Sequence, residues 1–462
     1  MIFDHNVRAI SGVLIAVSLG AVLAPLNSTM IAVALPSIMK DFESEIATTS
    51  WLVTGYLIVL ASIQPIFGKV GDRLGRRKLI VTGLGIFGIA SIGASISGSL
   101  EILIVFRLIQ AIGAGIIVPN GIAVIRETTS HTQRASAFGL IAAALGTAAA
   151  IGPALGGLLI TADSWPSIFY VNVPIIALAL FMVLRFIPKD IPNRSTGSFD
   201  MGGAFMLAAG TSGLALLIAE GTTQLDTIWF SIIGVGLAAF LVLFVFYEKH
   251  HKDPVIRPQI FRIRAFTAAS LGVALSNLAF YTMIIAIPLI LSAKFGFSNT
   301  KTGFTLMLLS GPLIIFAPLG GRLADRVGRR VPTFLGHGIS TIGLALLAFS
   351  SDPGITLILA CIGISGIGFG LAFASLQTAA IEAVKSSETG VASGVYSTSR
   401  YLGGIVGSAM LASLLILDTN SIEGFQSVTI MVAIAALLST IVVIKLPAGI
   451  PTKRNTKTLG QS

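Results

Sequence analysis

Long apolar runs separated by short polar segments dominate the pattern along the chain. Each run holds about twenty mostly apolar residues, the length that a helix needs to cross the hydrocarbon core of a bilayer. The pattern predicts an all-α membrane protein with fourteen transmembrane helices. Their approximate ranges are 11–36, 48–68, 79–98, 101–124, 135–160, 166–187, 202–220, 228–246, 266–291, 302–320, 332–350, 354–378, 391–416 and 426–444.

Composition excludes a soluble globular protein. Of 462 residues, 54% are hydrophobic and only 11% are charged, and the mean hydropathy is +0.92. Soluble domains carry about 25% charged residues. The single cysteine, Cys361, excludes an internal disulfide and a cysteine-based metal site. We expect no metal and no cofactor, and the chain has no phosphate-binding loop of the G-x-x-x-x-G-K-[ST] type.

The distribution of basic residues predicts the orientation. An even number of spans places both termini on one side, and placing them in the cytoplasm assigns 25 of the 30 Lys and Arg residues to cytoplasmic segments. Trp51, Trp165 and Trp229 then begin spans at the outer face, as interfacial tryptophans do. The net charge of +10 therefore reflects topology and not nucleic-acid binding, and we expect a multi-pass protein of the cell membrane.

The chain contains an internal repeat. The cytoplasmic loop Gly68–Arg77 aligns with Gly321–Arg330 at an offset of 253 residues, and residues 136–139 match residues 391–394 at an offset of 255. Two six-helix halves in the same orientation are typical of a large class of transporters. The predicted organisation is an N-terminal half at 1–190, two additional transmembrane helices at 191–250, and a C-terminal half with a short basic cytoplasmic tail at 251–462.

The charged residues of the repeated loop indicate its physical role. Asp72 lies among basic residues between two helix ends, where it can bond to basic side chains or to free N–H groups at a helix N-terminus. Such a cluster would latch helices together and release when the halves rock. The predicted latch consists of Gly68, Asp72, Arg73, Gly75, Arg76, Asp325, Arg326 and Arg329.

With these motifs the chain resembles the major facilitator superfamily, and more narrowly its fourteen-helix drug:proton antiporter family. Residues 68–80 resemble the family's loop motif, and residues 107–113 its fourth-span motif. The resemblance implies the major facilitator fold and secondary transport by alternating access. Its fifth-span motif, which marks exporters, matches Gly139, Gly152, Pro153, Gly156 and Gly157. The proline kinks this helix and the glycines allow close helix approach, so a seal near the outer face is expected.

Two arginines are predicted to lie inside the membrane. Arg107 and Arg400 are the only ionisable residues well inside predicted spans, where charges are costly and usually functional. The resemblance implies a role for Arg107, with Gln110, in proton transfer or gating; the alternative is that Arg107 bonds carbonyls and locks helices. The family usually has an aspartate where this chain has Asn27, so proton coupling would depend on peripheral acids. The candidates are Asp72, Glu101 and Glu382.

Polar and amphipathic residues on the spans are candidates for the lining of a substrate cavity. They are Asn27, Gln64, Asn120, Asn277, Tyr281, Gln377, Tyr396 and Arg400. Arg400 could face an anionic substrate or a partner in the other half, or it could be satisfied by carbonyl groups. A mostly apolar cavity with aromatic residues suits lipophilic cations or neutral drugs.

These observations favour a secondary active transporter that exports amphiphilic drugs or antiseptics by proton antiport. The alternative is an exporter of an endogenous metabolite, peptide or siderophore, or a facilitator that is not driven by protons. A remote alternative is a transporter-like membrane sensor or scaffold. No nucleophile–base constellation indicates an enzyme. The expected partners are a small amphiphilic molecule, protons and membrane lipid, and we expect a monomer.

Overall fold

The computed structural model describes residues 2–129, 134–190, 200–220, 227–251, 254–255, 258–350, 353–384, 389–416 and 422–448. Within these ranges every regular element is helical. The chain is an all-helical membrane protein: twelve segments of the described part are long and apolar enough to span a bilayer. Helices α10 and α17 occupy the two remaining predicted ranges and are 20 and 28 residues long.

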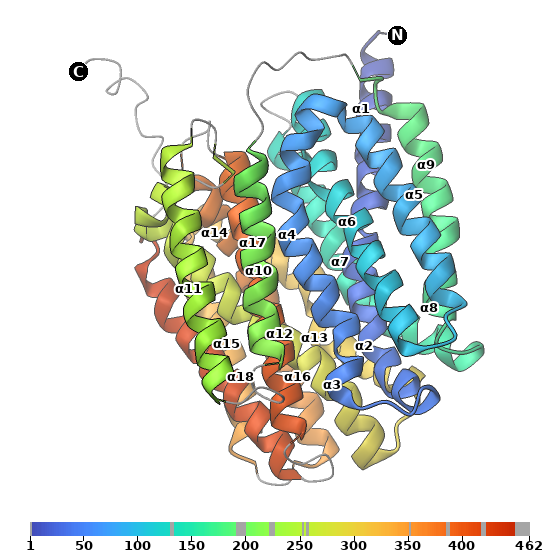
Figure 1. Cartoon of the computed structure of the whole chain (residues 1–462), viewed down its shortest axis with the longest axis vertical. Coiled ribbons are helices and arrows are strands. Elements are labelled where there is room, and N and C mark those ends of the chain that lie inside the picture. The colour runs from blue at the N-terminus through green and yellow to red at the C-terminus, as the bar shows by residue number, and fades with distance from the viewer. Residues whose placement is uncertain are drawn as a thin grey trace.

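The first helices form an N-terminal half (N-half). Its elements are α1 (Ile2–Ala21), α2 (Leu23–Asp41), α3 (Ile46–Thr49), α4 (Trp51–Leu74), α5 (Arg76–Ser95), α6 (Leu100–Thr128), α7 (Arg134–Ala162), α8 (Ser167–Tyr170) and α9 (Asn172–Phe186). Helices α1 and α2 follow each other within one candidate span, and so do α8 and α9. Figure 1 shows the start of α1 and the α4–α5 connection at one end of the molecule and α3 and α8 at the other.

The last helices form a C-terminal half (C-half). Its elements are η1 (Pro258–Arg262), α12 (Arg264–Phe295), α13 (Asn299–Ser310), α14 (Pro312–Val327), α15 (Arg330–Ala348), α16 (Ile355–Glu382), α17 (Thr389–Ile416), α18 (Ile422–Val442) and η3 (Val443–Lys445). The predicted span 302–320 is divided into α13 and α14. Pro312, which cannot donate a hydrogen bond, takes the first position of α14.

The repeat seen in the sequence extends to helix packing. In the N-half, a Cβ placed on Gly113 of α6 would lie 2.7 Å from the carbonyl oxygen of Gly83 in α5. In the C-half, a Cβ on Gly336 of α15 would lie 2.6 Å from the carbonyl oxygen of Gly368 in α16. The same pair of helices therefore packs backbone to backbone in both halves, at positions separated by offsets of 253 and 255.

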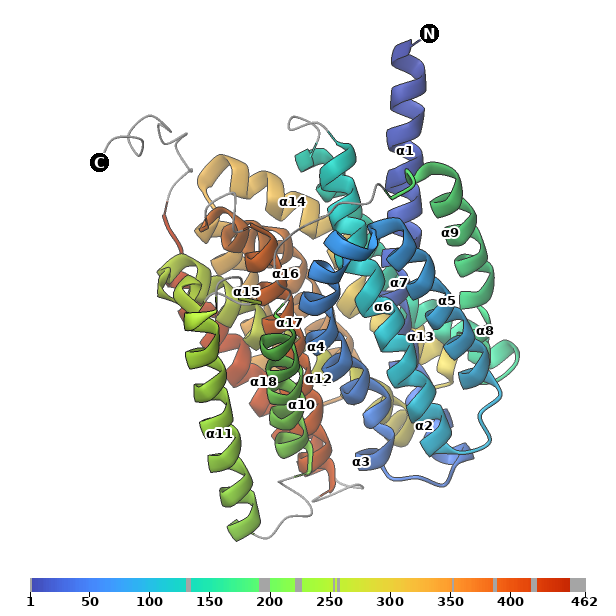
Figure 2. The same cartoon turned by 45° about the horizontal axis from the view of Figure 1, so that its top comes forward.

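Two helices lie between the halves in sequence. Helix α10 (Met201–Glu220) packs against α4 of the N-half and α17 of the C-half, whereas α11 (Thr227–His250) packs mainly on α10. Figure 2 shows α11 at the outside of the bundle, with α10 between it and α4 and α17. Almost none of α11 is buried, and its apolar side chains, such as Val235 and Val242, face outward. Helix α10 therefore covers the junction of the halves, and α11 offers an apolar outer surface.

A buried carboxylate ties these two helices together at one end. Asp200 accepts hydrogen bonds from the backbone N–H of Gly203 at 2.7 Å and from the hydroxyl of Tyr247 at 3.1 Å. Its other oxygen lies 3.5 Å from Nδ1 of His251. Asp200 thus caps the first turn of α10 and anchors the last turn of α11 to it.

Candidate functional site

The surface where the halves meet is called the seam here. It consists of α2, α4 and α7 on one side and α12, α13 and α17 on the other. At the end that carries α3 and α8, α7 and α13 touch through backbone. A Cβ on Gly157 would overlap the carbonyl group of Asn299, and one on Gly303 would overlap that of Pro153. Only glycine allows the two helices to approach this closely.

Hydrogen bonds reinforce this end of the seam. The hydroxyl of Thr300 donates to the carbonyl oxygen of Gly157 at 3.2 Å and to the hydroxyl of Thr161 at 2.6 Å. Nδ2 of Asn299 donates to the hydroxyl of Ser37 at 3.1 Å. Since Gly152 and Gly156 also lie against α2, next to Thr29 and Met30, the glycines of α7 hold three helices together.

The middle of the seam joins α4 to α17. The hydroxyls of Thr54 and Ser408 lie 2.6 Å apart, and the amide of Gln64 donates to the hydroxyl of Tyr401 at 3.1 Å. Between these bonds, Gly404 lies against Leu57 of α4 and against the ring of Tyr281 from α12, each about 3.0 Å from a Cβ built there. The middle of the seam therefore combines aromatic rings with hydrogen bonds between the halves.

Arg400 lies one helical turn before Gly404, at this aromatic level. Its guanidinium carbon is 5.1 Å from the ring centroid of Phe373 and 5.3 Å from that of Tyr396. The tyrosines at 281 and 401 interact with it electrostatically. Its Nε atom is buried and has no hydrogen-bond partner within the described part of the chain.

The N-half contains a different arginine site. Arg107 is fully buried, donates from Nε to the carbonyl oxygen of Leu52 at 3.2 Å and from Nη1 to Oε1 of Gln110 at 2.9 Å, and lies 4.2 Å above the ring of Tyr56. Gln110 in turn donates to the hydroxyl of Ser91 at 2.7 Å. The guanidinium thus joins α6 to α4 and, through Gln110, to α5.

Asn27 belongs to the same network. Its amide donates to Oδ1 of Asn172 at 2.6 Å, and Asn172 lies 3.4 Å from the hydroxyl of Ser91. Both asparagines are buried. No carboxylate of the described residues takes part in these hydrogen bonds, so this network carries the single charge of Arg107.

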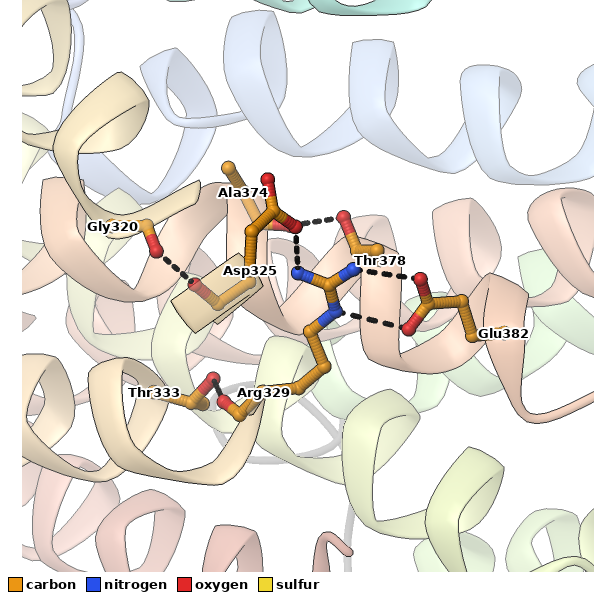
Figure 3. A network of polar contacts seen from close by, with 8 residues as sticks. Gly320, Asp325, Arg329, Thr333, Ala374, Thr378 and Glu382 are labelled. Atoms are coloured by element: carbon orange, nitrogen blue, oxygen red, sulfur yellow. Dashed lines mark hydrogen bonds and ion pairs between the residues drawn. The ribbon is translucent and has the colours of Figure 1, made fainter. Parts of the chain in front are cut away.

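Ion pairs lie at the opposite end of the molecule, where α1 begins. In the C-half, Arg329 forms a two-pronged pair with Glu382, with Nε–Oε2 at 2.9 Å and Nη2–Oε1 at 2.7 Å, and donates to Asp325 at 2.6 Å (Figure 3). The hydrogen bonds to Glu382, followed by those to Asp325, raise the pKa of Arg329 above its ordinary value. The pair ties the turn between α14 and α15 to the end of α16. That turn contains Gly328, whose φ of +90° suits glycine.

The N-half has a counterpart. Nε of Arg76 lies 2.8 Å from Oε1 of Glu127, so the start of α5 is tied to the end of α6. Gly75 has a φ of +96° in the same position of the turn. The N-half adds Asp190, whose carboxylate accepts from the backbone N–H groups of Arg77 and Lys78 at 2.9 Å each. An acidic side chain at this place stabilises the first turn of α5.

A family model described as Major Facilitator Superfamily matches residues 17–408 and residues 269–461, which together cover most of the chain. The chain belongs to the Major Facilitator Superfamily. The fold agrees with this membership, because a solved POT family transporter in complex with 5-aminolevulinic acid superposes with a TM-score of 0.69 at 14% identity, covering 95% of both chains.

Several characterised and uncharacterised transporters align with most of this superfamily member's sequence. YvkA of Bacillus subtilis, an uncharacterised transporter of the MFS type, is 35% identical over 86% of this chain and 89% of its own. The riboflavin transporter RibZ of Clostridioides difficile is 29% identical over 92% of both chains. The multidrug transporter MdtP of Bacillus subtilis is 30% identical over 88% of this chain and 74% of its own. The multidrug names agree with the resemblance to multidrug efflux proteins.

The predicted site residues of this transporter fall into separate groups. Gln64, Tyr281, Tyr396 and Arg400 lie together at the seam. Among the described residues, no side-chain hydrogen bond or ring contact links the other four cavity candidates to this group. Asn27 pairs with Asn172, Asn120 donates to the carbonyl oxygens of Phe67 and Ile116, Asn277 donates to that of Val273, and Gln377 is half-buried on α16.

The five coupling candidates are also dispersed. Arg107 and Gln110 are in contact inside the N-half, Glu101 is exposed in the first turn of α6, and Glu382 pairs with Arg329 in the C-half. Of the predicted latch, Asp325, Arg329 and Arg76 make the ion pairs above, while Arg326 is exposed. The side chains of Asp72 and Arg73, and Gly139, lie outside the described residues.

Three polar residues of the site were not predicted. Asn172 closes the network on Asn27, Asp190 caps α5, and Glu127 pairs with Arg76. The repeat could have revealed Glu127, because it precedes Glu382 by the offset of 255 found for residues 136–139. No comparable signal marks Asn172 or Asp190, because their partners are distant in sequence.

Proposed function

We propose that this superfamily member exports amphiphilic small molecules, drugs or antiseptics among them, by proton antiport with alternating access. The observation that carries the proposal is the backbone contact of α7 with α13 through Gly157 and Gly303. It closes the seam at the end that the basic residues predict to be the outer face, as expected for an exporter that takes substrate from the cytoplasmic side. The relatives named as multidrug transporters support the same substrate class.

The proposed topology follows the sequence. Fourteen transmembrane helices, counting α10 and α17, place both termini in the cytoplasm, and the two six-helix halves enclose one cavity at the seam. Lipid contacts the outer surface of α11, where apolar side chains are exposed. We propose that the protein works as a monomer.

Proton coupling in this proposal depends on groups outside the membrane interior. Asn27 cannot titrate, so one of the peripheral carboxylates, Asp72, Glu101 or Glu382, must bind the proton that favours one state over the other. Arg107 and Gln110 transmit or gate the change through their contacts with α4 and α5.

Everted membrane vesicles that hold a pH gradient test the proposal. We expect a drug of the exported class to collapse the gradient in vesicles with the wild-type protein, and Asp72→Asn to abolish the collapse. Asn27→Asp, which restores the acid usual in the family, is expected to increase the protons released per drug molecule. Drug-dependent collapse of equal size in vesicles without the protein would contradict the proposal.

One observation favours a second candidate, export of an endogenous metabolite, peptide or siderophore without proton coupling. Asn27 is satisfied by Asn172 in a network in which no described member is an acid. One relative is named as a riboflavin transporter, and riboflavin is a metabolite. Export measured in the same vesicles without collapse of the gradient would favour this candidate.

A further inference from the structure

Arg400 is a charge placed at the seam without an opposite charge. It is half-buried on α17, at the level of Tyr281 on α12 and Phe373 on α16. Helices α12 and α17 contain no Asp or Glu, and no ion pair of Arg400 occurs among the described residues. A guanidinium at this depth is expensive unless a counter-charge or several acceptors satisfy it.

The groups around Arg400 satisfy it only in part. The faces of Phe373 and Tyr396, at 5.1 and 5.3 Å, supply cation–π attraction, which is weaker than a charge-assisted hydrogen bond. The side chain of Tyr396 also forms a hydrogen bond with Arg400, but the buried Nε atom has no hydrogen-bond partner among the described residues. Arg107, which is fully buried, also has one unpartnered nitrogen among the described residues, Nη2, but it has a carbonyl and an amide oxygen in place for its Nε and Nη1 atoms. Arg400 therefore keeps donors available.

The side chains around Arg400 indicate which kind of ligand could accept a hydrogen bond from its guanidinium. Tyr281, Phe373 and Tyr401 are each half-buried, so part of each side chain remains accessible at the seam. A planar guanidinium matches a carboxylate, sulfonate or phosphate, and aromatic rings beside it match a flat apolar body. A lipophilic cation would meet repulsion from Arg400 and would find no acid on α12 or α17.

We propose that Arg400 binds the anionic group of an aromatic amphiphile, whose apolar body lies against Tyr281, Phe373 and Tyr401. The transported molecule is then an aromatic organic anion. This inference rests on the proposed export function, and it differs from the lipophilic cations or neutral drugs expected from the sequence. Since the cell interior is electrically negative, export of one negative charge gains about 2.3 kcal/mol per 100 mV. Such a substrate reduces the need for a coupling acid at Asn27.

Matched probes test the charge requirement. The full-length protein is reconstituted in phosphatidylcholine vesicles, and binding and uptake are measured for 2-naphthoate, its uncharged amide 2-naphthamide, and a naphthyl trimethylammonium cation. We expect the wild-type protein to bind naphthoate at least tenfold more tightly than the other two. Arg400→Gln should lower naphthoate binding at least tenfold and leave naphthamide binding unchanged, and Arg400→Lys should retain part of the preference.

Arg185→Gln is the matched control. Arg185 also lies over a phenylalanine ring, that of Phe186 at 5.4 Å, but it is exposed on α9 away from the seam. This variant should bind naphthoate like the wild type. If it lost the preference equally, the effect would be one of surface charge and the proposal would be wrong.

The outcomes separate this inference from the proposed function. Naphthoate binding that depends on Arg400, without uptake of any probe, would support the anion site and contradict export. Uptake of the cation or the amide with no preference for naphthoate would support export and overturn the anion site. Displacement of naphthoate by phosphatidylglycerol, with no uptake of naphthoate, would assign the arginine to a lipid headgroup and also overturn it.

Discussion

The two ends of the molecule are held together in different ways. At the end with α3 and α8, the contacts cross the seam: α7 meets α13 through Gly157 and Gly303, and Thr300 donates to Thr161. At the other end, the described ion pairs stay within one half each. Arg76 binds Glu127 in the N-half, and Arg329 binds Glu382 in the C-half.

This difference indicates which parts move together. Ion pairs between α5 and α6, and between α15 and α16, stiffen each half without joining it to the other. Contacts through glycine are short-range and depend on close fit, so a small rotation of one half loses them together. Each half is therefore a stiff body, and the two bodies meet at the glycine contact and along the middle of the seam, so a rocking motion has to break these contacts.

The largest effect is expected from the glycine contact. In Gly157→Ala, the added methyl would overlap the carbonyl of Asn299 and force α7 and α13 apart. Overpacking costs about 1–3 kcal/mol, so the closed seam should become about tenfold less populated. Spin labels at Leu158→Cys and Phe304→Cys, in a Cys361→Ser background, measure the separation of the two helices, which should increase.

Gly146→Ala provides the control on the same helix. A Cβ at Gly146 meets nothing within 4 Å, so the measured distance should stay that of the parent protein. An equal change in both variants would show that helix propensity, and not the contact, sets the distance. An unchanged distance in Gly157→Ala would contradict the role of the glycine contact.

The sequence predicts this end of the seam well, because the signal is local. The glycines and the proline of residues 152–157 occur within two helical turns, and small residues have few roles in a span besides close packing. The turns at Gly75 and Gly328 are predictable for a similar reason, because both glycines occupy the same position of the repeated loop.

Contacts that depend on tertiary packing could not be predicted. Asn27 and Asn172 are 145 residues apart in the sequence, and no pattern of residues around either one indicates that they are in contact. The cavity candidates show the same limit: the spans are clear, but which face of each helix points to the seam depends on packing. Gln64 and Tyr281 reach the seam, whereas Asn120 turns back to carbonyls of α4 and α6.

A smaller effect is expected from the ion pairs. Arg329→Gln removes the two-pronged pair with Glu382 and the bond to Asp325, and partly exposed pairs of this kind contribute about 1 kcal/mol. We expect the thermal midpoint of the purified protein to fall by about 2 °C. Hydrogen exchange should accelerate at the ends of α15 and α16 and stay unchanged at the glycine contact.

Arg76→Gln is the matched change in the N-half. Its partner Glu127 has a side chain that is 56% exposed, against 39% for Glu382, so more solvent screens the pair. Asp190 still caps α5 in this variant through backbone N–H groups. The midpoint should therefore fall less than in Arg329→Gln. Equal or larger destabilisation by Arg76→Gln would contradict this difference between the halves.

The smallest effect is expected from a single hydroxyl at the seam. Ser37→Ala removes the bonds between Ser37 and Asn299, at 3.1 and 3.3 Å, and leaves the backbone contact of α7 with α13 intact. A neutral hydrogen bond contributes about 0.5–1.5 kcal/mol, and Asn299 at this half-buried place can exchange its partner for water. The spin-label distance should therefore keep its main peak, with the open population raised about twofold. A shift as large as that of Gly157→Ala would mean that side-chain hydrogen bonds, and not glycine packing, close the seam.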